Sequence, residues 1–296
     1  YATHDATHDD THDDTHDDTH DTAHDTAAAA AVDTLLRMTD PVVALAMRRR
    51  PRTIETGRCA VLYPAVAEAA RRVGADAIGL VAVDGSAGLD LHVDRVGIHY
   101  DDGRSLGDPS SPVQLTAAVV GDRPVPQRAL PEVVARVGVD RDPLDPSTAD
   151  DARWLQACVP PDRPDEAARL RAEIAVAASA PTELLRGEAV DLLPEAVARV
   201  PAHALPVVVT TWALSRLTLE GRLRFLHRLD EVAAGRAVAW VSAEGVGVAP
   251  AVPTLGDRRA SGHSIVGLTM FDGATVRAEA IGRCWSRGRM LSWLAP

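Results

Sequence analysis

Apolar runs and amphipathic helices alternate along most of this 296-residue chain, and the alternation restricts the fold more than any other feature. Pro206–Thr211, PVVVTT, is typical of a strand that is buried on both faces. Further strands are predicted at 78–83, 133–139, 183–185 and 237–243, and helices at 148–158, 163–179, 191–200 and 219–234. A repeated β-α order gives parallel strands with helices on both faces. We therefore predict an α/β, Rossmann-like fold built on a mostly parallel, twisted sheet.

A C-terminal antiparallel hairpin is predicted to extend this sheet. The runs 264–271 and 274–283 flank Asp272-Gly273, a pair that favours tight turns. Between residues 95 and 120, alternating apolar positions around an Asp-Asp-Gly turn predict a β excursion.

Helices are predicted ahead of the first strand, at 27–47 with an interruption at Pro41, and at 56–73. We interpret the basic run 48–52, RRRPR, as a solvated connector. We therefore expect a tail at 1–30, a helical lead-in at 31–77 and a Rossmann-like domain at 78–296.

The tail is of low complexity, with THDD repeats that place a histidine at every fourth position from His4 to His24. Such spacing stacks imidazoles along one face of a helix, where neighbouring pairs chelate divalent metals. Threonine and aspartate form helices poorly, and the aspartates repel one another. We favour a disordered, solvated tail or a translated DNA repeat over a metal site, and predict no resident metal.

Charge and composition exclude several classes of partner. The chain carries a net charge of −11, but nine of its acidic residues and none of its basic ones lie in residues 1–26, so the remainder is close to neutral. No basic footprint for nucleic acid is present. No run of about 18 apolar residues suggests a membrane span, and no signal peptide is recognisable.

Cys59, Cys158 and Cys284 lack paired spacing, which indicates a reducing compartment. We expect a cytoplasmic protein that binds a small-molecule ligand, in an oligomeric state left open.

The candidate ligand site is the turn after the strand 78–83. Asp84, Gly85, Ser86 and Gly88 belong to a strand–turn–helix pattern in which small residues let the backbone approach a ligand. Gly85 and Gly88 would give this access, Ser86 would form hydrogen bonds, and Asp84 would bind a ligand ammonium group. The alternative is a tight turn that merely requires small residues.

Two further acids follow parallel strands. Asp140 ends the strand at 133–139, where a carboxylate accepts ribose hydroxyls; alternatively it serves as a turn residue or helix cap. Glu188 follows the strand at 183–185, near where an adenine would lie; alternatively it is an exposed acid ahead of helix 191–200. Open α/β sheets bind ligands at the carboxyl ends of their strands, so these acids are expected to converge with Asp84.

Catalytic residues are not identified by any motif. GSAG at 85–88 is not a nucleophile elbow, and the sequence contains no phosphate-binding loop, zinc-protease motif or paired cysteines. Trp212, after the strand 206–211, is interpreted as a packing residue rather than a stacking surface for substrate. Five histidines show no metal-ligand spacing: His92, His99, His203, His227 and His263.

Several short runs from about residue 53 to the end resemble a bacterial family, domain of unknown function 2332. These runs are TGRC (56–59), GSAGLDL (85–91), Asp94-Arg95 with Tyr100, RVGVD (136–140) with Pro143, DARWLQAC (151–158), Pro161-Asp162, WVSAE (240–244) and Gly288 to Leu294. Their order and spacing together carry the resemblance. The chain departs from the family pattern at Ala82, where an acid is expected, and at Asp84, where glycine is expected.

The resemblance implies a fold like that of class I S-adenosylmethionine methyltransferases, and no established activity. The first hypothesis that follows from the resemblance is methyl transfer from S-adenosylmethionine to an unidentified acceptor. The turn 84–88, Asp140 and Glu188 would then hold the cofactor. The alternative is a non-catalytic relative of the fold that acts as a binding or scaffold module.

Overall fold

A computed structural model describes residues 18–296 except 86, 181 and 274. The chain divides into two compact units, Tyr1–Pro51 and Arg52–Pro296. The predicted lead-in, residues 31–77, therefore falls on both sides of the boundary near residue 51. Among the described residues, the helices are too short or too polar to cross a membrane.

The first unit contains helices α1 (Asp18–Arg37) and α2 (Thr39–Arg48). Two predictions for this region are wrong. Residues 18–26, predicted to be a disordered tail, belong to α1, which confirms the helix predicted from residue 27 onward, and the chain breaks at Met38 rather than at Pro41. Pro41 lies in the first turn of α2. Backbone N–H groups there have no acceptor within the helix, so a proline, which lacks the N–H, is tolerated. The disorder predicted for residues 1–17 lies outside the described residues.

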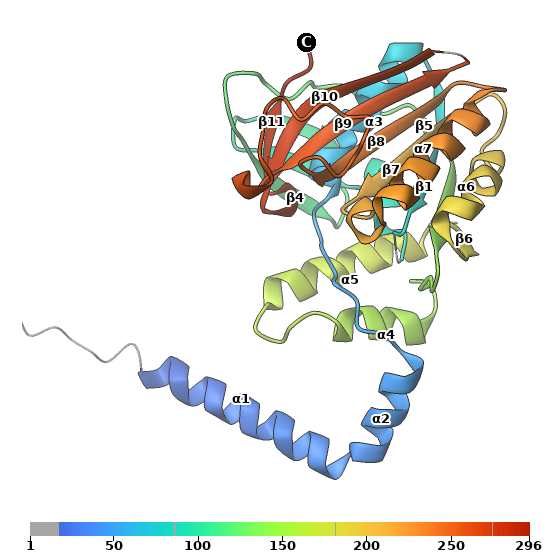
Figure 1. The fold of residues 1–296 in the computed structure, drawn as a ribbon. Helices are drawn as coiled ribbons and strands as arrows, with labels where there is room; N and C mark the ends of the chain where they lie inside the picture. Colours follow the sequence, from blue (N-terminus) through green and yellow to red (C-terminus); the bar gives the residue numbers. More distant parts are fainter. Residues whose placement is uncertain (1–17, 86, 181, 274) are drawn as a thin grey trace, which may run out of the picture. The chain divides into compact units, whose positions relative to one another are not determined.

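The second unit contains one mixed sheet, in the order β3-β2-β4-β11-β10-β9-β8-β7-β1-β5-β6 among the described strands (Figure 1). Their bounds are β1 Ala77–Val83, β2 Gly97–Tyr100, β3 Ser105–Gly107, β4 Gln114–Val119, β5 Glu132–Asp140, β6 Glu183–Arg186, β7 Leu205–Thr211, β8 Val238–Gly245, β9 Ser264–Asp272, β10 Thr275–Trp285 and β11 Met290–Trp293. From β6 to β8 all neighbours are parallel, and β9 and β10 form an antiparallel hairpin. The predicted α/β class, mostly parallel sheet and C-terminal hairpin are confirmed.

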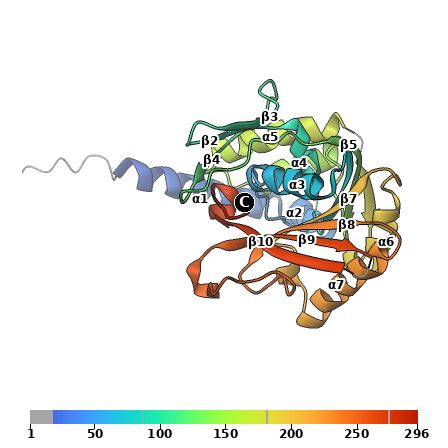
Figure 2. The same ribbon diagram turned by 90° about the horizontal axis from the view of Figure 1, so that it is seen from above.

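Helices cover both faces of the parallel strands. Their bounds are α3 Cys59–Val73, α4 Ala149–Ala157, α5 Pro164–Ala178, α6 Ala189–Ala198 and α7 Leu219–Ala233, with short 3₁₀ helices η1 Leu89–Arg95, η2 Leu214–Arg216, η3 Arg259–Ser261 and η4 Ser286–Gly288. Helix α3 packs on one side of β8 and β9, and α7 packs on the other (Figure 2). Helix α6 packs against β1 and β5 on the α7 side.

The central strands bury alternate side chains in two separate cores, as their apolar sequences require. On β7, Val207 and Val209 pack in the core that contains α3, while Val208 packs in the core that contains α6 and α7. Gly79 on β1 is needed for close packing, since a Cβ there would lie 2.4 Å from Val200. The long apolar runs therefore form the centre of the sheet.

The β excursion joins the far edge of the same sheet. β4 pairs in parallel with both β2 and β11, so the excursion is tied to the strand that follows β10. The predicted excursion at 95–120 is confirmed, but its attachment to β11 was not predicted.

The segment after the β1 turn differs from the prediction. In place of an α-helix starting at residues 88–92, the chain forms the 3₁₀ helix η1, in which His92 has non-helical dihedrals of φ −104° and ψ 28°. Helix α3 also starts later than predicted, at Cys59 rather than Thr56, and ends as predicted at Gly74 in the left-handed conformation.

Candidate functional site

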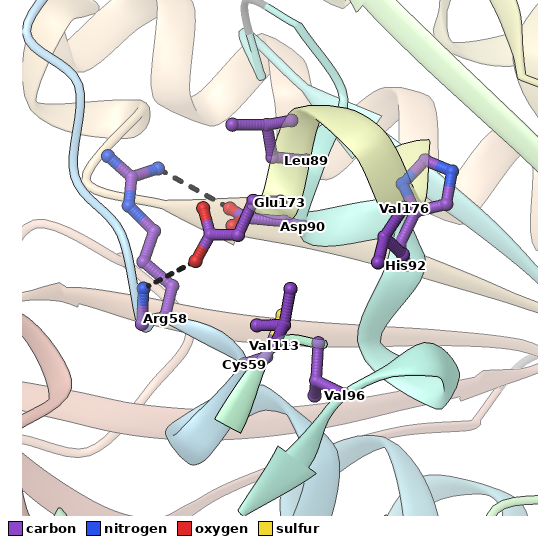
Figure 3. Close-up of a pocket in the computed structure, with 10 residues that line it drawn as sticks. Arg58, Cys59, Leu89, Asp90, His92, Val96, Val113, Glu173 and Val176 are labelled. Atoms are coloured by element: carbon purple, nitrogen blue, oxygen red, sulfur yellow. Dashed lines mark hydrogen bonds and ion pairs between the residues drawn. The ribbon is translucent and has the colours of Figure 1, made fainter. Parts of the chain in front are cut away.

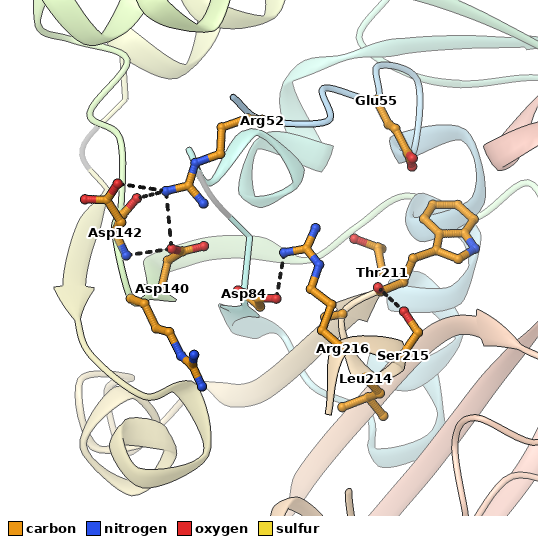
Figure 4. A network of polar contacts seen from close by, with 12 residues as sticks. Arg52, Glu55, Asp84, Asp140, Asp142, Thr211, Leu214, Ser215 and Arg216 are labelled. Carbon is orange, nitrogen blue, oxygen red and sulfur yellow. Dashed lines mark hydrogen bonds and ion pairs between the residues drawn. The ribbon is translucent and has the colours of Figure 1, made fainter. Parts of the chain in front are cut away.

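The carboxyl ends of β5, β1, β7 and β8 lie along one edge of the sheet, and the strand order reverses between β1 and β7. In open α/β sheets, this reversal separates the loops that follow the two strands and leaves a crevice between them. The polar residues near this point form two neighbouring groups, one after β1 and β5 and the other after β7 (Figure 4).

Asp84 directly follows β1 and has a left-handed backbone, with φ of 54°. Its N–H donates to Val139 O at 2.8 Å, and its carboxylate pairs with the Arg216 guanidinium at 2.8 Å. Burial raises the pKa of Asp84, and the Asp140 carboxylate adds to this rise while Arg216 opposes it. Aspartate tolerates the left-handed conformation better than most residues, which explains how it replaces glycine here.

The rest of the turn is compact. Gly88 is left-handed at φ 65° and precedes η1, and a Cβ there would meet Leu91 Cδ1 at 3.1 Å. A Cβ on Gly85 would meet Ala82 Cβ at 3.1 Å. Gly88 is therefore favoured by the turn itself, whether or not a ligand binds, whereas a side chain at Gly85 would be crowded by Ala82. Ser86, predicted to form hydrogen bonds with a ligand, lies outside the described residues.

Asp140 ends β5 and is only 2% exposed. Its Oδ1 accepts a hydrogen bond from the Asp142 N–H at 2.8 Å, and Arg52 Nη2 lies 3.8 Å from the same oxygen. The helix that follows is capped by Thr148 instead, so Asp140 is not a helix cap. Its side chain lies beside Asp84, as expected for adjacent parallel strands.

Glu188 follows β6, and its side chain pairs with Arg141 at 2.6 Å while remaining 48% exposed. It occupies the N-cap position of α6, but its side chain forms no capping hydrogen bond. The backbone nearby is tied to β5 by a hydrogen bond from Gly187 N–H to Asp140 O at 2.9 Å. Glu188 therefore lies at the same edge, with its carboxylate in a surface ion pair.

A second polar group, centred on Arg58, was missed by the sequence analysis. Arg58 donates to Thr211 Oγ1 at 2.7 Å and pairs with Glu55 at 3.0 Å and with Asp90 at 3.4 Å. Thr211, at the end of β7, donates to Asp90 Oδ2 at 2.8 Å. Burial alone lowers the pKa of Arg58, but the charges of Asp90 and Glu55 more than offset it, so the pKa is raised. TGRC and GSAGLDL, which contain Arg58 and Asp90, were the available signals.

Trp212 packs as the sequence analysis proposed. Its Nε1–H donates to Ser264 Oγ at 2.7 Å, and the Arg58 guanidinium lies 5.2 Å from its ring centroid. The left-handed backbone of Trp212, with φ of 54°, turns the chain sharply after β7. The indole therefore helps to hold Arg58 beside Thr211.

A small cavity lies against this second group (Figure 3). Its volume of about 10 Å³ matches a single water molecule. The titratable groups in its wall are Arg58, Cys59, Asp90, His92 and Glu173.

Glu173 is the group in this wall that titrates near neutral pH. It reaches the cavity from α5 and accepts a hydrogen bond from the Gly57 N–H at 3.1 Å. Burial raises its pKa to about 7. Burial also lowers the pKa of His92 to about 4 and raises that of the Cys59 thiol, so both are uncharged at pH 7. Glu173 is thus suited to exchange a proton with a molecule in the cavity.

Glu244, at the end of β8, has a structural task. Its Oε1 accepts hydrogen bonds from the N–H groups of Ala213 and Leu214 at 3.1 and 3.2 Å, which fixes η2. Its Oε2 is buried without a hydrogen-bond partner, and burial raises the pKa of this carboxyl to about 7.

No metal centre is found among the residues whose side chains are described, since no three of their His, Cys, Asp and Glu side chains are grouped to hold an ion. The histidine repeat of the tail is outside this set. His263 instead pairs with Asp257 at 2.9 Å, an acid that also binds Arg283.

Comparison with known proteins identifies one family. A family profile described as an uncharacterized protein conserved in bacteria, DUF2332, matches residues 9–293. No match was found among curated proteins, and none among solved structures. Because the profile covers nearly the whole chain, with both polar groups included, this protein belongs to the bacterial family of domain of unknown function 2332.

Proposed function

We propose that this protein binds S-adenosylmethionine at the carboxyl edge of β1 and β5 and is a methyltransferase of the class I type. The observation that carries the proposal is the meeting of Asp84 and Asp140 beside the turn 84–88, next to the reversal of strand order. The order β6-β5-β1-β7-β8 supports it, because Rossmann-type nucleotide-binding sheets use the same arrangement of five strands.

The chemistry of the donors fits such a cofactor. Asp140 offers a nearly buried carboxylate for the two ribose hydroxyls. Asp84 and Arg216 form a pair of opposite charges that match the ammonium and carboxylate groups of the methionine part. The bound cofactor supplies an activated methyl group, so the protein mainly needs to position the acceptor.

The second polar group would lie beside the acceptor, since its cavity of about 10 Å³ holds only a water-sized molecule. Glu173 would take a proton from the acceptor near neutral pH, since its pKa is about 7. Arg58, Asp90 and Thr211 would fix the wall of the cavity through their mutual hydrogen bonds.

A binding module without catalysis is the second candidate. One observation favours it: the acids assigned to the cofactor already face arginines. Asp84 pairs with Arg216, and Glu188 with Arg141, while Asp140 lies near Arg52. Such pairs also stabilise the loops at this edge without any ligand.

Calorimetric titration of the full chain with S-adenosylmethionine and S-adenosylhomocysteine tests the proposal. We expect both to bind, and at one hundred times the dissociation constant to stabilise the fold by about 2.7 kcal/mol. Asp140→Asn should weaken binding at least about tenfold, whereas Asp230→Asn, on the exposed face of α7, should not change it. Absence of binding by either compound at millimolar concentration would rule out the cofactor proposal. Binding without methyl transfer to any candidate acceptor would favour the second candidate.

A further inference from the structure

An open groove with two arginines lies over the β excursion, outside the sites described above. It has a volume of about 400 Å³ and is lined by His99, Tyr100, Asp101, Thr116, Arg169 and Arg289, together with two alanines of β4, Ala117 and Ala118. Pockets of about 300–1,000 Å³ are typical of small-molecule sites. Its size is therefore sufficient for a metabolite-sized ligand.

The two arginines reach the groove from distant parts of the chain. Arg169 lies on α5, and Arg289 lies between η4 and β11. Within the described part of the chain, neither guanidinium forms a hydrogen bond or an ion pair. By contrast, the nearby arginines Arg58 and Arg287 both pair with Glu55. Two guanidinium groups thus face one groove without an ion pair to a protein carboxylate, although the charge of Arg169 acts to lower the pKa of Glu173 and Asp101 also lines the groove.

The backbone holds Arg289 over the groove. Ala118 N–H on β4 donates to Arg289 O at 2.8 Å. The preceding turn is unusual, because Ser286, Arg287 and Gly288 all have left-handed φ values, of 47°, 58° and 99°. Non-glycine residues in this region cost about 1–3 kcal/mol each and are found where the surrounding structure demands them. Here the turn directs the chain so that Arg289 lies against β4.

The groove adjoins the wall of the small cavity. A Cβ on Gly57 would lie 3.8 Å from Arg169 Nη1, and the Gly57 N–H already donates to Glu173. Arg169 and Glu173 are one helical turn apart on α5 and so project from the same face. A ligand held by Arg169 would therefore lie next to Gly57, which donates to Glu173 and directly precedes Arg58.

Three other polar groups of the groove, on His99, Tyr100 and Asp101, already have partners within the protein, whereas the exposed Thr116 has none among the described residues. Asp101 is the acid among the lining residues, and its Oδ1 accepts a hydrogen bond from Val119 N–H at 2.8 Å. Both ring nitrogens of His99 have partners, Ser105 and Gln114, at 2.9 Å. The two arginines are the cationic donors among the lining residues that form no hydrogen bond or ion pair in the described structure, and guanidinium forks match carboxylate and phosphate groups.

We propose that the groove between Arg169 and Arg289 binds a small molecule through a carboxylate or phosphate group. The proposal goes beyond the cofactor site and does not depend on it.

The test uses the full chain with two probes, inorganic phosphate and succinate, titrated calorimetrically at constant ionic strength. We expect saturable binding of at least one probe at millimolar concentration. A response to both probes identifies a general anion site, and a response to one alone identifies the group that the natural ligand carries. Arg169→Gln and Arg289→Gln should each weaken binding about tenfold or more.

Arg171→Gln is the matched control, because Arg171 lies on the same helix, is exposed and bonds only Ala167 O among described residues. It removes the same charge without altering the groove. Arg289 is exposed and Arg169 forms no hydrogen bond or ion pair among the described residues, so both variants are expected to fold, as circular dichroism would verify. The proposal is overturned if neither probe saturates the wild-type protein, or if the double variant binds as well as Arg171→Gln.

Discussion

Asp84 and Asp140 end neighbouring parallel strands, and their carboxyl groups interact. Burial raises the pKa of Asp84, and the nearby Asp140 carboxylate raises it further, against the opposing charge of Arg216. The two acids, one directly after β1 and one at the end of β5, thus share one small region at the carboxyl edge of the sheet. Their coupling gives the first prediction.

Asp140→Asn should lower the pKa of Asp84, because it removes a negative charge while leaving an oxygen to accept the Asp142 N–H. Titration of the side-chain carboxyl signals by ¹³C NMR measures this pKa directly. Asp230→Asn is the control and should leave it unchanged. An unchanged Asp84 pKa in Asp140→Asn would mean that the two carboxyl groups do not interact in solution.

Asp84→Ala should be less stable than Asp84→Gly by about 1 kcal/mol, because only glycine adopts the left-handed backbone without cost. Both variants lose the same ion pair with Arg216, so the comparison isolates the backbone. Urea denaturation of the two variants gives the difference. Equal stabilities would contradict the left-handed conformation at this position.

Arg58→Gln should lower the free energy of unfolding by about 3 kcal/mol, since it removes the buried positive charge between the largely buried Glu55 and Asp90 carboxylates, which keep only Arg287 and the Thr211 hydroxyl. Arg287→Gln is the matched control: Arg287 also pairs with Glu55 but is 60% exposed, and should cost less than about 1 kcal/mol. Thermal and urea unfolding measure both. Similar losses in the two variants would show that Arg58 is not the centre of this group.

Glu244 should make the protein less stable as the pH rises. Burial raises the folded-state pKa of Glu244 from 4.5 to about 7, so its stabilising contribution is complete below pH 4.5 and is lost as the pH passes through about 7. The loss amounts to about 3 kcal/mol. The side chain of Glu244→Gln is neutral at every pH. Between pH 4.5 and 7.5 the free energy of unfolding of this variant should therefore rise by about 3 kcal/mol relative to that of the wild type.

Comparison of the two proteins is necessary because other groups titrate in the same range. Glu173 acts in the same direction as Glu244, whereas His92, with its pKa lowered by burial to about 4, stabilises the fold as the pH rises to 6.5. Urea denaturation at pH 4.5, 6 and 7.5 separates the Glu244 contribution. A stability difference that does not change with pH would contradict the raised pKa.

The sequence predicted the elements that carry a strong local signal. β7 and β8 are continuous apolar runs, and the Asp272-Gly273 pair marks the hairpin between β9 and β10. Helix ends were harder to predict, since the chain after Gly88 closes into a 3₁₀ helix that buries Leu91, His92 and Val93. Packing of this segment, rather than its helix propensity, decides its shape.

The candidate site was predicted only in part, for a physical reason. Asp84 and Asp140 follow recognisable strands, so sheet geometry alone brings them together. Arg58, Asp90 and Thr211 come from a loop, a 3₁₀ helix and a strand end, and no spacing in the sequence connects them. Arg169 and Arg289 line the same groove only because the tertiary fold brings α5 and the segment before β11 together, so the sequence does not predict their proximity.

The pairing of β4 with β11 has a consequence for synthesis of the chain. Ala118 and Val119 find their strand partners in Met290 and Leu291, at the other end of this unit. A growing chain that has reached β10 but not β11 carries two open strand edges, on β4 and on β10, and such edges template aggregation. The far side of the sheet, including the groove with Arg289, is therefore completed only after β11 has left the ribosome.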